Sequence, residues 1–300
     1  MTAALALSRG GPASSAWCQR WRDHRSRWRH VGEAERFDPA RYTVEPVEET
    51  HAREFVSTHH YLVSWPAAIH RFGLWDRSDG QLVGVAVYAA PVQASVLSKV
   101  FPDLEAYRAS VELARFVLLD QVPANAESWC LARTFRHLLD RGVRGVVSFA
   151  DPMPRLTPSG TVTPGHRGVI YMATNAIYTG RGTPRTLIVL PDHSILNGRT
   201  AQKIRRGEPG HQAAEQRLVS LGARARTPGQ DARAWLREAL DTIHATRIRH
   251  HGPHRYAFPL GKTRKDRDRI TIGIPRAPYP RIADQTPEAL QAAGAKTETP

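Results

Sequence analysis

The stretch that decides the fold runs from Val111 to Asp151 and reads VELARFVLLDQVPANAESWCLARTFRHLLDRGVRGVVSFAD. Apolar residues recur at alternate positions from Val111 to Leu119, with the one exception of Arg115, and this period predicts a strand. An amphipathic helix is expected over Trp129–Asp140, where apolar residues recur at helical spacing. A second apolar strand is expected over Gly145–Asp151. Strand, loop, helix and strand in this order predict an α/β domain.

One charged residue, Arg115, lies in the middle of the first of these strands. Its apolar neighbours on the same face are expected to be Val111, Leu113, Val117 and Leu119. A guanidinium that is buried or half-buried requires a partner. Two kinds of partner remain open: a carboxylate such as Glu112, or an anionic ligand.

The loop between this strand and the helix, residues 120–128, is a candidate anion site. The first turn of a helix presents free backbone N–H groups and the positive end of the helix dipole, which together can hold a pyrophosphate. Asn125 or Ser128 is expected to cap this helix. The loop has no glycine-rich phosphate-binding pattern. Cofactor binding is therefore predicted here from the architecture and not from a motif.

The hydrophobic pattern predicts further elements on both sides of this unit. Before it come a helix over Val47–His60 and two strands, Ile69–Trp75 and Leu82–Tyr88, joined by a tight turn. After it, strands are expected over 168–173, 184–191 and 255–260, and helices over 212–221 and 232–247. Together these elements predict an α/β fold with a mixed, largely antiparallel sheet flanked by helices.

We expect a single domain over residues 37–270, including a basic C-terminal region. Residues 1–36 are expected to form a basic tail rich in Trp and Arg. Residues 271–300 are rich in Pro, Ala and Thr and are expected to be a disordered tail.

The charge of the chain indicates a polyanionic partner. The formal net charge is +14 with a pI near 10.5, and arginine supplies most of the basic residues. Arginine binds phosphate in a bidentate geometry, so nucleic acid is the first expectation. A high-GC genome explains the choice of arginine over lysine but not the excess of positive charge.

In the N-terminal tail, a helix would place Trp17, Trp21 and Trp28 on one face. Two roles are open for such a face. It would stack on nucleic acid, or it would dock on the domain.

The remaining composition predicts a cytoplasmic protein that contacts no membrane. The two cysteines, Cys18 and Cys130, form no disulfide framework or metal motif and fit a reducing compartment. No apolar run approaches the roughly 20 residues that span a bilayer, and the first residues lack the features of a signal peptide. A homodimer is compatible with the sequence.

Residues able to do chemistry gather around Asp151, where a strand ends and a loop begins, a common place for sites on a rigid scaffold. The segment Gly165–Asn175 (GHRGVIYMATN) then brings His166 and Tyr171. His166 would hydrogen-bond a substrate or, alternatively, cap its own loop.

Two further residues, His60 and Tyr61, follow the predicted N-terminal helix. Histidine, carboxylate and tyrosinate are suitable iron ligands, so these two residues with Asp151 and Tyr171 are a candidate open metal site. The alternative is that they are packing residues with polar tips. A second histidine cluster is interpreted as surface or phosphate-contacting; it consists of His250, His251 and His254.

Several short motifs follow one another in a characteristic order: ELAR at 112–115, SFADP at 148–152, and GHRGVIY at 165–171. With Ser128 and Asn175 they resemble the signature of the Mom family of phage DNA-modification proteins, over residues 55–180 of this chain. The resemblance implies an acetyltransferase-like (GNAT-like) fold. It implies conversion of adenine in double-stranded DNA to N6-(carbamoylmethyl)adenine, which protects phage DNA from host restriction. It also implies an acetyl-CoA-type cofactor and iron (Fe2+).

The resemblance implies roles for individual residues. Arg115 and Ser128 would contact the acyl-CoA, and Asn125 is added as a cofactor residue from its place at the helix start. The implied iron and catalytic cluster consists of His60, Tyr61, Asp151 and Tyr171, to which His166 is added as a catalytic residue. The chain departs from the family in a longer loop over 153–164 and in extensions at both ends.

The implied product also bears on the chemistry. A thioester is electrophilic at its carbonyl carbon, so ordinary acyl transfer would acetylate N6. Attachment through the neighbouring methylene carbon requires that carbon to be activated, which redox-active iron would provide. Two alternatives remain: an ordinary N-acetyltransferase acting on a protein or small amine, and a basic nucleic-acid-binding protein without catalysis. A phage-encoded protein would act in the host cytoplasm.

Overall fold

The computed structural model describes residues 17–22, 25–30, 37–60, 62, 64–123, 125–153, 155–156, 162–163 and 165–280. The chain divides into two compact units, which are described separately. The first comprises Met1–Val147, Ala173–Ala176 and Phe258–Gly273, and the second Ser148–Met172, Ile177–Ala257 and Ile274–Pro300. No helix in the described part of the chain is long and apolar enough to cross a membrane.

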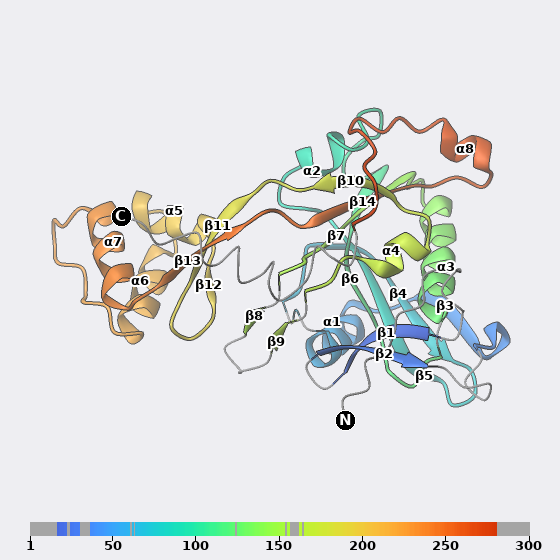
Figure 1. Cartoon of the computed structure of the whole chain (residues 1–300), viewed down its shortest axis with the longest axis horizontal. Helices are drawn as coiled ribbons and strands as arrows, with labels where there is room; N and C mark the ends of the chain where they lie inside the picture. Colours follow the sequence, from blue (N-terminus) through green and yellow to red (C-terminus); the bar gives the residue numbers. More distant parts are fainter. Residues whose placement is uncertain are drawn as a thin grey trace, which may run out of the picture. The chain divides into compact units, whose positions relative to one another are not determined.

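The first unit is a sheet with helices on both faces (Figure 1). Its strand order is β7-β6-β5-β4-β3, and the last three pairings along this row are antiparallel. The strands are β3 (Tyr42–Pro46), β4 (Ala68–Asp76), β5 (Gln81–Ala89), β6 (Ser110–Leu118) and β7 (Gly145–Ala150, of which residues up to 147 belong here). Helix α3 (Ala126–Asp140) connects β6 to its neighbour β7, the type of connection that parallel strands require. The predicted α/β class and the mixed, largely antiparallel sheet are confirmed.

Two helices cover opposite faces of this sheet. Helix α1 (Glu49–His59) packs Ala52, Phe55 and Val56 against Val85 and Val87 of β5. On the other face, the hydroxyl groups of Tyr88 and Thr134 in α3 lie 2.6 Å apart. Val87 and Tyr88 are consecutive strand residues, so their side chains point to opposite faces. The predicted N-terminal helix and hairpin are therefore confirmed.

A β-bulge in β6 changes the face on which its side chains lie. Val87 is opposite Arg115, but the next residue, Tyr88, is opposite Leu113, so Ala114 is an extra residue in β6. Leu113 therefore shares the face of Tyr88 and α3. Arg115 and the residues after it share the α1 face, where Val117 packs. The prediction that Val111, Leu113, Val117 and Leu119 share one face is wrong, because an uninterrupted period of two cannot anticipate a bulge.

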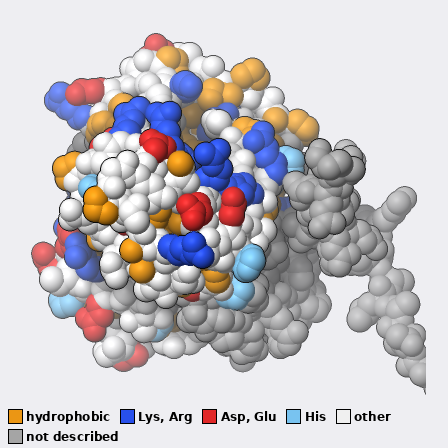
Figure 2. Space-filling model, turned by 90° about the vertical axis from the view of Figure 1, so that its left-hand side faces the viewer, with side chains coloured by type: hydrophobic (Ala, Val, Ile, Leu, Met, Phe, Trp, Pro, Cys, Tyr) orange, Lys and Arg blue, Asp and Glu red, His pale blue; other side chains and the backbone are white. Residues whose placement is uncertain are grey.

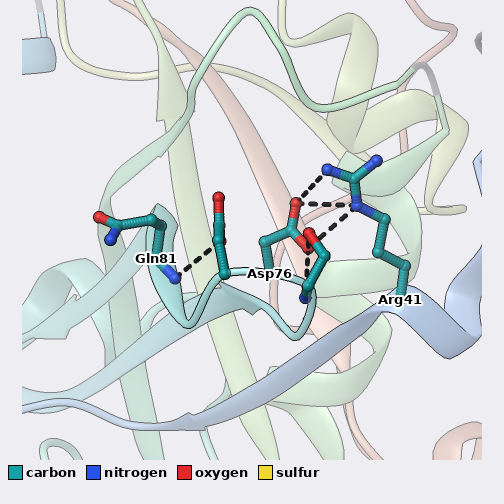
Figure 3. A network of polar contacts seen from close by, with 5 residues as sticks. Arg41, Asp76 and Gln81 are labelled. Atoms are coloured by element: carbon teal, nitrogen blue, oxygen red, sulfur yellow. Dashed lines mark hydrogen bonds and ion pairs between the residues drawn. The ribbon is translucent and has the colours of Figure 1, made fainter.

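A buried carboxylate holds the turn between β4 and β5 (Figure 3). The side chain of Asp76 is 4 % exposed and accepts hydrogen bonds from Arg41 Nε at 2.9 and 2.8 Å and from Ser78 N at 3.0 Å. The guanidinium of Arg41 keeps the pKa of Asp76 well below its usual value, with burial acting in the opposite direction. Asp79 accepts from Gln81 N at 3.0 Å in the same turn.

Replacing Asp76 by Ala is expected to lower the free energy of unfolding by about 1–2 kcal/mol, because the donors of Arg41 and Ser78 lose their acceptor. Urea denaturation measures this change. Asp79→Ala is the control, since Asp79 is exposed and accepts one hydrogen bond. Equal losses in the two variants would contradict a special role for the buried carboxylate.

The second unit contains two groups of paired strands. β10 (Ile177–Arg181) pairs antiparallel with β14 (His254–Pro259, of which residues up to 257 belong here). A three-stranded sheet has the order β12-β11-β13, with bounds Ile195–Leu196, Arg185–Val189 and Thr246–His250. The helices are α4 (Val169–Ala173), α5 (Gly198–Arg206), α6 (His211–Ser220) and α7 (Ala232–Thr242). A separate apolar cluster around the buried Trp235 and Ile204 joins α5, α6 and α7 to this three-stranded sheet.

Smaller elements complete the described part of the chain. They are β1 (Trp17–Arg22), β2 (Arg25–His30), a 3-10 turn (Pro39–Arg41), α2 (Ser95–Ser98), β8 (Arg155–Leu156), β9 (Val162–Thr163) and α8 (Arg264–Asp268). β1 pairs antiparallel with β2, so the N-terminal Trp/Arg segment is a hairpin and the predicted helix is wrong. The backbone N–H and C=O groups of β1 bond to those of β2, whereas in a helix they would bond within one segment. The predicted tail beyond residue 280 lies outside the described residues.

Two other predictions are corrected by backbone conformation. Residues 168–173 are not a strand, because Gly168 has φ +76° and its carbonyl accepts from the N–H groups of Tyr171 and Met172, which starts α4. The predicted helix over 232–247 ends at Thr242. His244 has φ +55° and the N–H of Ala245 donates to the carbonyl of Leu240, a C-terminal arrangement that stops a helix.

Candidate active site

The second unit places a carboxylate, Asp151, directly after β7. Its Oδ1 accepts from the N–H of Met153 at 3.0 Å and lies 2.9 Å from His250 Nε2. The N–H of His166 donates to the Asp151 carbonyl at 2.7 Å, so the loop of His166 returns to the end of β7. The structure thus brings together Asp151, His166 and His250.

The tautomer of His250 follows from its contacts. The N–H of Gly252 donates to His250 Nδ1 at 2.9 Å, so Nδ1 acts as an acceptor and carries no proton. Nε2 then carries the proton of the neutral ring and donates it to Asp151. The side chain of His250 is 1 % exposed, whereas that of Asp151 is 20 % exposed. A buried histidine therefore orients a carboxylate that solvent can reach.

His166 is neutral at physiological pH. Burial lowers its pKa to about 4, and the nearby charge of Asp151 only partly opposes this effect. A neutral imidazole can donate one hydrogen bond and accept another, but it supplies no positive charge. His166 is thus suited to contact a substrate and not to stabilise an anion.

Tyr171 lies in an aromatic cluster of the second unit. Its ring centre is 5.3 Å from that of Tyr256, which is also 5.3 Å from that of Tyr178. Tyr171 is 7 % exposed. The hydroxyl of Tyr256 donates to the carbonyl of Arg167, and burial raises the Tyr256 pKa above its usual value. The ring of Tyr171 packs in this cluster, and its catalytic and iron-binding roles remain predictions.

The position of Gly168 requires glycine. Its φ of +76° is unfavourable for other residues, and a Cβ atom there would lie 2.7 Å from ring carbons of both Tyr171 and Tyr256. This close approach seats the loop that carries His166 on the aromatic cluster.

The prediction that the C-terminal histidine cluster is on the surface is wrong for two of its members. His250 and His254 are 1 % and 2 % exposed, and His254 Nδ1 lies 2.8 Å from the hydroxyl of Tyr178. His251 is exposed. The two histidines lie in strands paired with distant segments, His250 opposite Arg185 and His254 opposite Arg181, so the local sequence carries no signal of their burial.

Arg115 lies in the first unit and donates to neutral groups. Its Nη2 contacts the Ser64 carbonyl at 2.6 Å and the Ser64 hydroxyl at 2.9 Å, and its Nη1 contacts the Ala114 carbonyl at 2.7 Å. Burial raises the pKa of Glu112 above its usual value. The charge of the nearby Arg115 acts in the opposite direction. Within the described residues Arg115 forms no ion pair with Glu112, and the choice between another carboxylate and an anionic ligand stays open.

The start of α3 differs from the prediction. The helix begins at Ala126 and not at Trp129, and Asn125 precedes it with φ +71°. The side chain of Asn125 makes no capping hydrogen bond. The hydroxyl of Ser128 lies inside the helix and donates to the Asn125 carbonyl at 3.1 Å. Neither residue caps the helix as predicted, and their cofactor roles remain predictions.

The predicted iron ligands are distributed over both units. His60 belongs to the first, where its Nδ1 accepts from the N–H of Leu62 at 2.9 Å. Asp151 and Tyr171 belong to the second, and Tyr61 lies outside the described residues. Among the residues with described positions, no three or more His, Cys, Asp or Glu are grouped to hold a metal.

Comparison with known proteins identifies a family for most of the chain. The sequence profile of the Mom protein family matches residues 41–281. The search of curated proteins finds no match.

The chain also resembles solved structures of acetyltransferases. One is the ribosomal-protein-S5-alanine acetyltransferase from Vibrio fischeri (TM-score 0.32, 11% identity, 49% of this chain and 85% of that one). A second is a putative phosphinothricin N-acetyltransferase (TM-score 0.31, 9% identity, 74% and 99%). A third is a spermidine N-acetyltransferase from Vibrio cholerae (TM-score 0.28, 12% identity, 53% and 88%).

Proposed function

The chain belongs to the Mom protein family, and from this membership we propose that it is a DNA-modifying transferase. The proposed reaction converts adenine to N6-(carbamoylmethyl)adenine with an acetyl-CoA-type cofactor and protects phage DNA from restriction. One observation supports the proposed active site above all: the buried His250 holds the carboxylate of Asp151, which solvent can reach.

Asp151 is the proposed general base. Its carboxylate would accept the proton that N6 of adenine loses. The acyl carbon that bonds to N6 must also lose a C–H bond, which releases a second proton and two electrons. Redox-active iron, if it is bound, would pass those electrons to an oxidant. His250 is a positioning residue, because its Nε2–H group holds one oxygen of the carboxylate. His166, neutral at pH 7, is proposed to hydrogen-bond the adenine. Catalytic roles for Tyr61 and Tyr171 remain predictions.

The proposed substrate is double-stranded DNA. The amino group of adenine is hydrogen-bonded within the duplex, so the base must leave the stack before it reacts, at a cost of a few kcal/mol. The net charge of +14 supports phosphate contacts that offset this cost. Affinity for DNA is therefore expected to fall steeply with salt.

The cofactor is proposed to bind at the first unit, near β6 and the start of α3, with Arg115, Ser128 and Asn125 as its contacts. The bulge at Ala114 supports this proposal, because it turns Arg115 away from the register of the preceding residues.

Replacing Arg115 by Ala is expected to weaken acetyl-CoA binding about tenfold, the effect of losing one charge-assisted hydrogen bond to phosphate. Isothermal titration measures the change, and a smaller thermal stabilisation by acetyl-CoA should accompany it. Arg108→Ala is the matched control, because Arg108 is an exposed arginine of the same unit that pairs with Glu105. Unchanged affinity in Arg115→Ala would remove Arg115 from the cofactor site.

Iron binding by His60, Tyr61, Asp151 and Tyr171 remains a prediction. The described residues do not by themselves supply a ligand set: Asp151 Oδ1 already accepts from His250 and Met153, and His60 Nδ1 from Leu62. The role proposed for Asp151 is limited to the N6 proton, and activation of the acyl carbon is the chemistry that iron would supply if it is bound.

Mass spectrometry of nucleosides tests the function. Plasmid DNA is isolated from cells that express the protein in iron-supplemented medium, and the protein is shown to be in the soluble fraction. A deoxyadenosine that carries the added carbamoylmethyl mass is the expected result. Unmodified DNA would contradict the proposal and favour an ordinary N-acetyltransferase or a DNA-binding protein without catalysis.

A further inference from the structure

The helices of the second unit carry a hollow lined by arginine. Its lining residues are Gly198, Gln202, Arg205 and Arg206 of α5, and Arg233 of α7. The four residues of α5 recur at intervals of three and four, so they share one side of that helix. Gly198 has no side chain and nothing within 4 Å of where a Cβ would lie, which leaves this end of the hollow open.

The two helices that carry these arginines are anchored by buried apolar residues. Ile204 in α5 and Trp235 in α7 are 0 % and 2 % exposed and belong to the same apolar cluster. Arg205 directly follows Ile204, and Arg233 lies two residues before Trp235. Both arginines are exposed. The hollow is therefore built by two packed helices, while its charged groups face solvent.

Two of the three arginines at the hollow, Arg205 and Arg233, have no carboxylate partner among the described residues. No Asp or Glu is among its described lining residues. Glu208, close to α5, pairs with Arg199 at 2.6 Å and with Arg206 at 3.9 Å, and Asp231, close to Arg233, accepts from the N–H of Ala234 at 2.8 Å. Within the described residues Arg205 and Arg233 form no ion pair. Guanidinium groups that converge without a carboxylate fit a phosphate group, which accepts two hydrogen bonds from each arginine.

Charge beyond the hollow favours a polymer over a small phosphate ester. Residues 184–250 contain twelve Lys or Arg and six Asp or Glu. Figure 2 faces the side on which α5, α6 and α7 lie in Figure 1 and shows Lys and Arg side chains gathered in several patches. A chain of phosphates can contact such patches in succession, whereas a single small ligand occupies one hollow.

We propose that this arginine hollow is a docking surface for the phosphate backbone of duplex DNA, through Arg205, Arg206 and Arg233. The inference rests on the proposed function, because it locates where the DNA substrate is held. Contacts of this type bind DNA of any sequence and orient it, while the choice of base is made elsewhere.

The test compares two variants of equal net charge by fluorescence anisotropy with a labelled duplex of random sequence. One is R205A/R206A/R233A. The matched control is R53A/R108A/R264A, which removes three exposed arginines of the first unit that pair with carboxylates on their own segments. The hollow variant is expected to lose at least about tenfold in affinity, and its dependence of log K on log salt should be shallower by about 3. The control should change far less.

A third variant, R205K/R206K/R233K, keeps the charge but not the bidentate geometry, so its salt dependence should match that of the parent while its affinity falls. Equal losses in the hollow variant and the control, or an unchanged affinity in the hollow variant, would overturn the inference.

Acetyl-CoA also carries phosphates, so its thermal stabilisation of the hollow variant is measured as well and is expected to be unchanged. Loss of that stabilisation with DNA affinity retained would assign the hollow to the cofactor and overturn the inference. The nucleoside assay on the parent protein separates this failure from failure of the proposed function.

Discussion

Replacing Asp151 by Ala is expected to abolish adenine modification, with a loss of about 10³-fold or more in rate, while DNA binding stays intact. The physical reason is that a buried donor holds this carboxylate while solvent can still reach it. Loss of a positioned general base typically costs 10²- to 10⁴-fold, by order of magnitude. Quantitative mass spectrometry of nucleosides measures the rate, and anisotropy with duplex DNA measures binding.

Two companion variants sharpen this prediction. Asp151→Asn keeps an oxygen that accepts from His250 and Met153 but cannot take a proton, so it should be as inactive as the Ala variant. His250→Ala keeps the carboxylate but loses its orienting donor, so it should retain partial activity, roughly 10- to 100-fold below the parent. An active Asp151→Ala protein would exclude Asp151 from the chemistry.

The second large effect is expected from Gly252→Ala, which should lower the free energy of unfolding by about 3 kcal/mol. About 1–2 kcal/mol comes from the left-handed backbone, since Gly252 has φ +90°. A further 1–3 kcal/mol, roughly, comes from overpacking. The new Cβ would collide with the carbonyl oxygen of Gly182 and lie 2.7 Å from its carbon. Backbone atoms cannot rotate away as a flexible side chain does.

Gly180→Ala is the matched control for this variant. Gly180 has a similar φ of +79° in the same unit but nothing within 4 Å of its Cβ position. It should lose only the conformational part, about 1–2 kcal/mol, as measured by urea denaturation. Equal losses in the two variants would show that the contact with Gly182 contributes nothing.

Gly252→Ala should also reduce activity in the fraction that folds. The N–H of Gly252 donates to His250 Nδ1 and so determines which nitrogen of His250 carries the proton for Asp151. A shift of this turn releases His250 and, through it, the carboxylate. Gly180→Ala should leave the rate unchanged.

The main strands and helices of the first unit were predictable because the apolar pattern within each segment indicates its secondary structure. The apolar runs of β4 and β5 and the apolar side of α1 each lie within a short stretch of sequence, where hydrophobic pattern indicates strands and helices. The position of Asp151 at the end of β7 was predictable for the same reason. The excess of arginine, likewise visible in the sequence, indicates a polyanionic partner.

Local patterns failed where one residue redirects the chain. The extra residue Ala114 in β6 reverses which face its neighbours share, and periodicity carries no sign of it. Gly168 turns an apolar run that resembles a strand into the start of α4. His244 ends a helix whose apolar pattern continues beyond it.

The sequence by itself determined the α/β class, the family resemblance and the carboxylate around which the proposed chemistry is built. Only the tertiary structure decided that His250, 99 residues away along the chain, is the donor that orients Asp151. It also decided that α5 and α7 place Arg205, Arg206 and Arg233 around one hollow. The physical reason is that hydrophobic periodicity reflects local secondary structure, which involves residues only a few positions apart. A hydrogen bond or a charge cluster, in contrast, depends on which distant segments the packed core brings into contact.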